Sequence, residues 1–356
     1  MNRIQKLDLL KKDLRSFQPG PKNSITDIKG VRVGHLTINK DTQDQAGEKI
    51  SVRTGLTAII PCDMMEENRL FAGMHGFRSN TEITGYQVTD DFCYLNSPVI
   101  LANSRNIGRV YNAIFSFGFS LGRSEIWPPV ALGLDDSWLN DLDKFSIEEN
   151  QIIRLLQNCS SKPVEEGSAG VGFGLRAFGW KGGIGSSSRI FSFGGKKFHV
   201  GVMVASNHGN LFSFNQKKQG TAKDSAPTPG SLNIVMSVDI PLVPYQIKTV
   251  ANSVVVGLPS IHTMTNNQDS VTCFLFSTAN AMSLKNEGPP VFNYRIAGDS
   301  VLDIVTRAGV EAVNEALLNS LLKASPVEGR LGRRVETIPK AEIRKLFSKK
   351  GSSTGI

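Results

Sequence analysis

The order of the apolar segments is the feature that most constrains this fold, because it separates a layered sandwich from an alternating α/β sheet. Period-two alternation and short apolar runs predict strands, and apolar residues at intervals of three and four predict helices. The predicted strands cover residues 28–38, 57–60, 99–102, 202–205 and 271–276, and the predicted helices cover 106–121, 244–258 and 300–323. Strands and helices come in groups and do not alternate one by one. We therefore expect a layered α+β sandwich and not a doubly wound sheet.

Positive charge is concentrated at the two ends of the chain. The 356 residues carry a formal net charge of +8. Residues 1–22 hold six basic and two acidic residues, and residues 330–356 hold eight and two, so the residues between them carry −2. Phe347 is the only aromatic residue of the basic C-terminal stretch that could stack on a base. We interpret both ends as solvated extensions and expect no nucleic-acid partner; a phosphate-binding tail is the alternative.

The chain carries no signal for a membrane or a metal. No apolar run reaches the roughly 18 residues that cross a bilayer, and the first 22 residues mix leucine with lysine, arginine and aspartate. We therefore expect a cytoplasmic protein with no membrane partner. Four cysteines and five histidines are scattered, with no C-x-x-C pair and no set at metal-ligand spacing. The sequence predicts no metal and no cofactor.

Two segments depart from the pattern of strands and helices. Residues 167–185 contain eight glycines in nineteen positions, but no G-K-[ST] follows, which excludes a phosphate-binding loop. Residues 215–230 are polar and contain two prolines, which predicts an exposed loop. This loop ends abruptly at a predicted strand whose first residue is Ser231. By pattern alone, such a Gly-Ser junction is most simply a turn.

Five stretches of the chain resemble, in the expected order, the self-cleaving family of L-aminopeptidase/D-amidase-esterases, β-aminopeptidases and nylon-oligomer hydrolases. They cover residues 24–35, 178–189, 202–209, 230–248 and 276–281, and residues 315–324 resemble the last helix of that family. The most specific part is Lys181-Gly-Gly-Ile-Gly185. The resemblance implies an αββα sandwich that forms a single domain over residues 24–340. A basic extension of residues 1–23 precedes this domain, and a basic tail of residues 341–356 follows it.

The resemblance also implies that the chain cleaves itself between Gly230 and Ser231. The processing loop is then residues 215–230, the large subunit residues 1–230 and the small subunit residues 231–356. A serine hydroxyl needs a base, and a chain-terminal α-amine with a pKa of about 7.7–8.0 can serve as one. Cleavage creates that amine on the nucleophile itself. Gly230 leaves its carbonyl unhindered and its backbone free to take the geometry of an N-to-O acyl shift.

Three further residues match catalytic positions of the family. The resemblance implies that Asn207 directs an amide N–H at the oxyanion, that Lys181 supplies a cation, and that Asp269 orients the amine. The cation would keep the amine neutral and help to stabilise the oxyanion. The residues alone leave other interpretations open. Asn207 could cap the end of its strand, and Lys181 could be a surface lysine in a glycine-rich turn.

The chain departs from the family at two places. The family carries two polar residues, two apart, before its last core strand, and counting back from Ser277 places Asp269 and Val271 there. The second acid is then lost, unless a shift in register makes Asn267 and Asp269 the pair. Trp138 lies opposite the family's site tyrosine, and an indole donates a hydrogen bond but cannot accept one. The role that needs a phenol oxygen is therefore open.

Asn80 and Glu82 resemble a family segment near the substrate entrance and, with Trp138, are the predicted substrate-binding residues. The function that follows is a serine N-terminal-nucleophile aminopeptidase or amidase. It would act on the N-terminal residues of short peptides or on small amino-acid amides and esters. The family implies a homo-oligomer, a tetramer of cleaved heterodimers. One alternative is an uncleaved relative with an assembly or binding role; another is acyl transfer, although the related ornithine acetyltransferases use a threonine where this chain has Ser231.

Overall fold

The fold is that of a computed structural model, which describes residues 16–63, 67–78, 81–123, 128–143, 145–208, 230–258, 269–284, 289–339 and 341–343, and the backbone of 212–214 and 217–219. Asn80, Asn267 and most of the predicted processing loop lie outside these residues. Two short strands precede and enter that loop, β11 (Phe212–Phe214) and β12 (Lys217–Gln219), and they pair with each other. No helix in the described part of the chain is long and apolar enough to cross a membrane.

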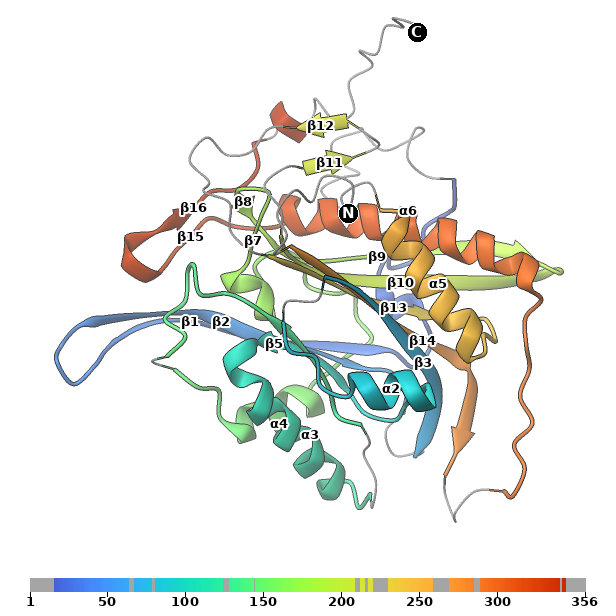
Figure 1. The fold of residues 1–356 in the computed structure, drawn as a ribbon. Coiled ribbons are helices and arrows are strands. Elements are labelled where there is room, and N and C mark those ends of the chain that lie inside the picture. Colours follow the sequence, from blue (N-terminus) through green and yellow to red (C-terminus); the bar gives the residue numbers. More distant parts are fainter. Residues whose placement is uncertain are drawn as a thin grey trace, which may run out of the picture.

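Two sheets lie face to face at the centre of the molecule (Figure 1). The four-stranded sheet has the order β1-β2-β5-β6 and consists of β1 (Arg32–Gln43), β2 (Lys49–Ile60), β5 (Val99–Asn103) and β6 (Val130–Leu134). The six-stranded sheet has the order β4-β3-β14-β13-β10-β9 and consists of β3 (Asn68–Phe77), β4 (Tyr94–Leu95), β9 (Gly183–Phe193), β10 (Lys196–Asn207), β13 (Ser231–Val238) and β14 (Ser270–Ser283). Buried apolar side chains from the facing sides form one core between the sheets.

Helices cover the outer face of each sheet, so the layers follow the order αββα (Figure 1). The helices α3 (Ile107–Ser120) and α4 (Glu149–Gln157) pack on the four-stranded sheet. The helices α5 (Pro244–Val256) and α6 (Leu302–Leu322) pack on the six-stranded sheet. The predicted αββα sandwich is therefore confirmed, and the three long predicted helices correspond to α3, α5 and α6.

Short elements connect these layers. They are α2 (Tyr86–Phe92), the strand pairs β7 (Arg176–Ala177) with β8 (Trp180–Lys181) and β15 (Val327–Glu328) with β16 (Arg334–Val335), and the 3₁₀ turns η1 (Ile25–Asp27), η3 (Ser104–Asn106), η4 (Gly170–Gly174), η7 (Asp299–Val301) and η8 (Arg330–Gly332). The turn η1 explains why β1 begins at Arg32 and not at residue 28. Ser24 accepts a hydrogen bond from Thr26 N, and Asp27 accepts one from Ser24 N, so local capping overrides the alternating pattern.

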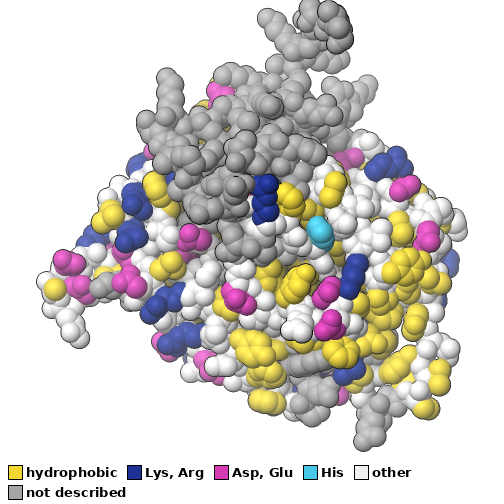
Figure 2. All heavy atoms as spheres, in the orientation of Figure 1, with side chains coloured by type: hydrophobic (Ala, Val, Ile, Leu, Met, Phe, Trp, Pro, Cys, Tyr) yellow, Lys and Arg dark blue, Asp and Glu magenta, His cyan; other side chains and the backbone are white. Residues whose placement is uncertain are grey.

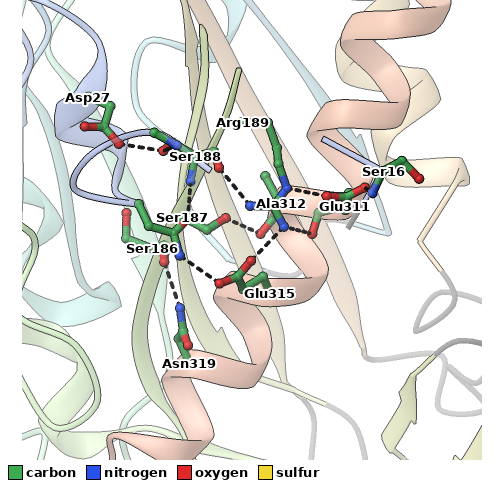
Figure 3. Close-up of polar contacts among 12 residues, drawn as sticks. Ser16, Asp27, Ser186, Ser187, Ser188, Arg189, Glu311, Ala312, Glu315 and Asn319 are labelled. Atoms are coloured by element: carbon green, nitrogen blue, oxygen red, sulfur yellow. Dashed lines mark hydrogen bonds and ion pairs between the residues drawn. The ribbon is translucent and has the colours of Figure 1, made fainter. Parts of the chain in front are cut away.

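A buried polar cluster fastens α6 to β9 (Figure 3). Arg189 donates from Nε to Glu311 at 2.5 Å and from Nη2 to Glu315 at 2.7 Å, and its side chain is 1% exposed. Ser187 Oγ donates to the carbonyl oxygen of Ala312 at 2.6 Å. We call Arg189, Glu311, Glu315 and Ser187 the Arg189 cluster. Because the ions are paired and buried, they fix the position of the helix on the sheet.

Candidate active site

The predicted nucleophile lies at the start of a central strand. Ser231 is the first residue of β13, opposite Asn207 on β10 and Ser270 on β14. It is 1% exposed, and its Oγ has no hydrogen-bond partner among the described residues. A buried hydroxyl without a partner costs stability, so it is unusual in a purely structural position.

The peptide bond before Ser231 is held by its neighbours. The N–H of Ser270 donates to the carbonyl oxygen of Gly230 at 2.9 Å. A Cβ atom on residue 230 would lie 2.2 Å from the carbonyl oxygen of Asn207 and 2.5 Å from Cα of His208. Only glycine fits at this position, because backbone atoms occupy the space that a side chain would need. Packing therefore requires Gly230 in addition to any requirement of the chemistry.

The side-chain amide of Asn207 has a fixed orientation. Its Oδ1 accepts a hydrogen bond from Arg176 N at 3.1 Å, and its Nδ2 donates to the carbonyl oxygen of Asp135 at 2.6 Å. Both partners belong to other segments, so the amide does not cap the end of its own strand. One of the two Nδ2 hydrogens is used by this contact. The arrangement leaves a preoriented donor on the strand beside Ser231.

Lys181 is fully buried, so the interpretation as a surface lysine is wrong. Its Nζ donates to the carbonyl oxygens of Gly172, Leu175 and Gly182 at 2.7, 2.8 and 2.9 Å. Burial lowers the pKa of Lys181 to about 7. Three carbonyl acceptors match the three N–H donors of an ammonium group. Lys181 therefore holds the glycine-rich segment together. All three of its N–H donors are used by these carbonyl groups, so any effect of its charge on Ser231 acts through space and not through a hydrogen bond.

Lys181 belongs to the same corner of the sheet as Asn207. The first residue of β9, Gly183, pairs with Ser206 of β10. The β7–β8 hairpin pairs Arg176 with Lys181, and Arg176 N donates to Asn207. The sheet and the hairpin thus bring together residues of two predicted family stretches, 178–189 and 202–209.

The strand β14 shows where two of the residues that the register of the predicted acids involves, Val271 and Asp269, lie. Val271 pairs with Leu232 and lies in the apolar core on the helix side of the sheet, so it does not share the inner face with Ser231. Asp269 directly precedes Ser270, the residue bonded to Gly230, and is 2% exposed. Val271 therefore does not lie beside Ser231, and the position of a second acid stays a prediction. The alternative register pairs Asp269 with Asn267, which lies outside the described residues.

Trp138 is held between two guanidinium groups. The Cζ atom of Arg176 lies 3.8 Å from the ring centroid and that of Arg333 lies 4.3 Å from it. Burial, with the nearby Arg333 charge, lowers the pKa of Arg176 to about 10. Arg176 also binds Asn207 through its backbone N–H. Trp138 is therefore linked to Asn207 through Arg176, and its role in substrate binding stays a prediction.

Of the two remaining predicted substrate-binding residues, Asn80 and Glu82, the structure describes only Glu82. Asn80 lies outside the described residues. Glu82 has an exposed side chain, and its carbonyl oxygen accepts a hydrogen bond from Gly133 N at 2.8 Å. Its backbone thereby lies beside β6, the strand of the opposite sheet that faces β13.

Sequence reasoning missed Asn233. It lies two residues after Ser231, so the alternation of β13 places both on the inner face of the sheet. Asn233 is 1% exposed, its Nδ2 donates to the carbonyl oxygen of Gly133 at 2.8 Å, and its Oδ1 has no partner in the described structure. The signal available in the sequence was a single amide in a strand of otherwise apolar and small residues.

Sequence reasoning also missed a buried acid on the opposite sheet. Asp136 accepts hydrogen bonds from Thr54, Asn103 and Asn140, the first at 2.5 Å. Burial raises the pKa of Asp136 to about 6, although all three donors favour the carboxylate. Asp136 follows Asp135, whose carbonyl binds Asn207. The network fixes the segment on which that contact depends.

Two histidines, His208 and His35, have contacts that account for them without a role in the site. His208 follows Asn207 but packs edge-on against Phe178, with ring centroids 4.8 Å apart, and burial lowers its pKa to about 3. His35 binds Thr57 at 3.0 Å, and burial lowers its pKa to about 4. Among the described residues, no three His, Cys, Asp or Glu side chains lie close enough together to hold a metal ion.

Comparisons with known proteins match residues 23–335 to Peptidase family S58. The β-peptidyl aminopeptidase of Sphingosinicella microcystinivorans is 29% identical over 354 residues, which cover 93% of this chain and 89% of that protein. A β-aminopeptidase from Burkholderia sp. superposes with a TM-score of 0.83 at 28% identity, covering 98% of this chain and 99% of the other. An L-aminopeptidase D-Ala-esterase/amidase from Ochrobactrum anthropi superposes with a TM-score of 0.83 at 30% identity, covering 93% and 95%.

The matched family spans nearly the whole sandwich, including Ser231, Asn207 and Lys181. The structure of the Ochrobactrum enzyme is described as a variant of the Ntn hydrolase fold, which agrees with the two facing sheets and their helical layers. The resemblance found in the sequence is therefore confirmed. The chain belongs to peptidase family S58 and is a hydrolase of the aminopeptidase type.

Proposed function

We propose that this enzyme is a serine N-terminal-nucleophile aminopeptidase and amidase, activated by its own cleavage between Gly230 and Ser231. The observation that carries the proposal is the buried, unpartnered Oγ of Ser231 beside a carbonyl that already accepts a hydrogen bond from Ser270 N. A nucleophile and a polarised carbonyl are then adjacent at one strand end. This arrangement supports attack on the peptide bond that precedes the serine.

The proposed cleavage uses these contacts. Ser231 Oγ attacks the carbonyl carbon of Gly230, the carbon–nitrogen bond breaks, and the nitrogen takes up the proton that the hydroxyl loses. Water then hydrolyses the resulting ester, which leaves a carboxylate on Gly230 and a free α-amine on Ser231. The N–H of Ser270 stabilises the negative charge that develops on the carbonyl oxygen, because it is already aimed at that atom at 2.9 Å.

Turnover uses the groups that cleavage releases. The Ser231 α-amine takes the hydroxyl proton as Oγ attacks the substrate carbonyl, and it returns the proton to the leaving amine. The remaining Nδ2 hydrogen of Asn207 binds the oxyanion of the substrate, because two backbone contacts hold this amide in place. Asp269 offsets the charge of the protonated amine. Water hydrolyses the acyl-enzyme and restores the free hydroxyl.

The substrate class is inferred from the relatives together with the site. The names of the relatives describe a β-peptidyl aminopeptidase and an L-aminopeptidase with D-Ala-esterase/amidase activity. We infer that this enzyme removes N-terminal residues from short peptides and hydrolyses amides and esters of small amino acids. Because the nucleophile is buried between two sheets, a small acyl group fits this site better than a long chain.

Intact mass spectrometry of the purified protein tests activation. Cleavage at the proposed bond gives two fragments of about 25 and about 14 kDa, in proportion to their lengths. The smaller fragment begins with Ser231, and a panel of amino-acid p-nitroanilides then reports turnover. A single species of 38.7 kDa after long incubation at neutral pH would support the alternative of an uncleaved relative with a binding or assembly role.

We also propose that the enzyme assembles as a homo-oligomer, a tetramer of cleaved heterodimers. Large apolar side chains are exposed along residues 291–296, including Val291 at 70% and Ile296 at 58%. Figure 2 shows hydrophobic side chains gathered at the lower right of the face drawn, where Figure 1 places α2 and the ends of β3 and β14. Exposed apolar patches of this kind support a protein interface. Light scattering should give about four times 38.7 kDa, and a monomeric mass would refute assembly.

A further inference from the structure

The inner face of β13 carries three buried polar atoms for which the described structure provides no partner. Ser237 Oγ is at the far end of the strand, and the other two, Ser231 Oγ and Asn233 Oδ1, are at its start. They lie one side-chain repeat apart on the same strand, roughly 7 Å between their Cα atoms. The proposed function uses the first atom and leaves the second unexplained. Asn233 is therefore the nearest unused polar group along the strand of the nucleophile.

The amide of Asn233 can turn in only one way. Its Nδ2 donates to the carbonyl oxygen of Gly133 on the opposite sheet at 2.8 Å, which directs Nδ2 toward β6 and fixes Oδ1 on the other side of the amide. Gly133 itself has no side chain, and a Cβ there would lie 2.6 Å from the carbonyl oxygen of Glu82. Nothing at residue 133 can therefore donate to Oδ1 except through a change of backbone.

A buried acceptor without a donor costs stability. An apolar residue of the same size would avoid this cost in an inner core that is otherwise apolar around Val235 and Phe274. The acceptor is fixed, buried and one repeat from the nucleophile, so it is preorganised to receive an N–H donor that arrives with a ligand.

We propose that Asn233 Oδ1 accepts a hydrogen bond from the amino end of the acyl part of the substrate, which makes Asn233 a specificity-determining residue. The inference rests on the proposed function, because the acyl group must be attached to Ser231 Oγ for its amino end to lie near Asn233. Both atoms are buried in the uncut chain, so the contact requires that cleavage first frees Gly230 from the packed strand end. The acceptor is a neutral amide, so it recognises the N–H group and not the charge.

Two substrates that differ only in the amine test this proposal. Alanine p-nitroanilide and propionyl p-nitroanilide have the same carbon skeleton, and only the first carries an amino group. We expect Asn233→Leu to raise KM for the alanine compound by roughly 10- to 100-fold, as a lost buried hydrogen bond implies. The propionyl compound should be hydrolysed as by the wild-type enzyme, with kcat little changed for both. An equal rise in KM for both substrates would show that Asn233 only connects the two sheets through its hydrogen bond to Gly133.

Asn233→Asp separates the role of the Oδ1 acceptor from that of the hydrogen bond that Nδ2 donates to Gly133. It keeps an oxygen acceptor near the position of Oδ1 but loses the N–H group that donates to the carbonyl oxygen of Gly133. We expect this variant to retain the preference for the alanine compound. If the preference falls to the value of the leucine variant, the donor is what matters and the proposal is refuted.

Ser237→Ala is the matched control. Ser237 lies on the same inner face of β13, its Oγ is also buried without a partner in the described structure, and it is at the far end of the strand from Ser231. Its substitution should leave the ratio between the two substrates unchanged. Each variant is first analysed on a denaturing gel. If Asn233→Leu gives two bands and keeps the wild-type ratio between the two substrates, the role of Asn233 is refuted and the proposed function stands. If the wild-type chain is uncut and inactive, the proposed function itself is refuted.

Discussion

The Arg189 cluster and the Ser231 site are both buried and polar, but their hydrogen bonding is opposite. Arg189 donates to Glu311, to Glu315 and to the carbonyl oxygen of Ser188, so its guanidinium is enclosed by acceptors. At the site, Ser231 Oγ and Asn233 Oδ1 have no partner among the described residues. A satisfied buried network adds stability, whereas buried groups left without partners remain available to a ligand.

The part of the chain that most resembles the family has a largely structural role. The most specific part is Lys181–Gly185, and the family stretch that contains it extends to Arg189. In the structure, Lys181 braces three carbonyl groups and Arg189 holds a helix. Much of that stretch therefore maintains the layer next to the site, and only a small number of residues are placed to take part in the chemistry.

The largest expected effect is that of Ser231→Ala. Alanine removes the proposed nucleophile of both cleavage and turnover, so the chain should stay at 38.7 kDa and lose at least about 10⁴-fold in kcat/KM. Its free energy of unfolding should be unchanged or higher than that of uncut wild-type chain, because an unpartnered buried hydroxyl is gone. Ser231→Thr and Ser231→Cys should still cut. Two bands from the alanine variant would mean that another protease cleaves the chain.

Arg189→Met should produce the opposite result, a loss of stability with the site intact. Removing the guanidinium leaves the buried Glu315 carboxylate and the partly buried Glu311 carboxylate without their partner, which should lower the free energy of unfolding by about 3–5 kcal/mol. Urea unfolding measures the change, and kcat of the folded fraction should stay near that of the wild type. Arg154→Met, at an exposed position of α4, is the control. A loss below about 1 kcal/mol would show that the cluster does not fasten the helix.

Asp269→Asn should give a smaller loss of activity. If Asp269 orients the Ser231 amine, losing its charge costs about 2–3 kcal/mol, or roughly a 30- to 150-fold fall in hydrolysis, and cleavage slows as well. Val271→Asp is the contrasting variant. Because Val271 lies in the helix-side core, a carboxylate there should lower stability and restore no activity. Near-normal turnover by Asp269→Asn would show that the site carboxylate lies elsewhere.

The smallest effect concerns acid stability at the strand end beside the site. The folded state holds the pKa of His208 at about 3, below the ordinary value of 6.5, so the unfolded chain binds the extra proton first. Its contribution is fully present above pH 6.5 and is lost as the pH falls toward 3, by about 2 kcal/mol at pH 5. His208→Phe keeps a ring against Phe178 and should flatten this part of the pH dependence. Parallel stability profiles of variant and wild type would contradict the assignment.

The sequence by itself determined the elements and their grouping. Apolar periodicity is a local property, so it located β5, β10, β14, α3, α5 and α6 and indicated a layered sandwich. The order of the family stretches also identified Ser231, Asn207 and Lys181 as residues to examine. Local capping at Ser24 was the kind of signal that alternation alone overlooked, which is why β1 began later than predicted.

Only the tertiary structure decided which polar groups are satisfied. Arg189 meets Glu311 and Glu315 across more than a hundred residues, and Asn233 meets Gly133 across a hundred. Val271 faced the helices because of the register between β13 and β14, which counting along the sequence could not supply. Burial and hydrogen bonding between distant segments depend on how the layers pack. The sequence could therefore identify the proposed nucleophile but could not reveal the unpartnered acceptor near it.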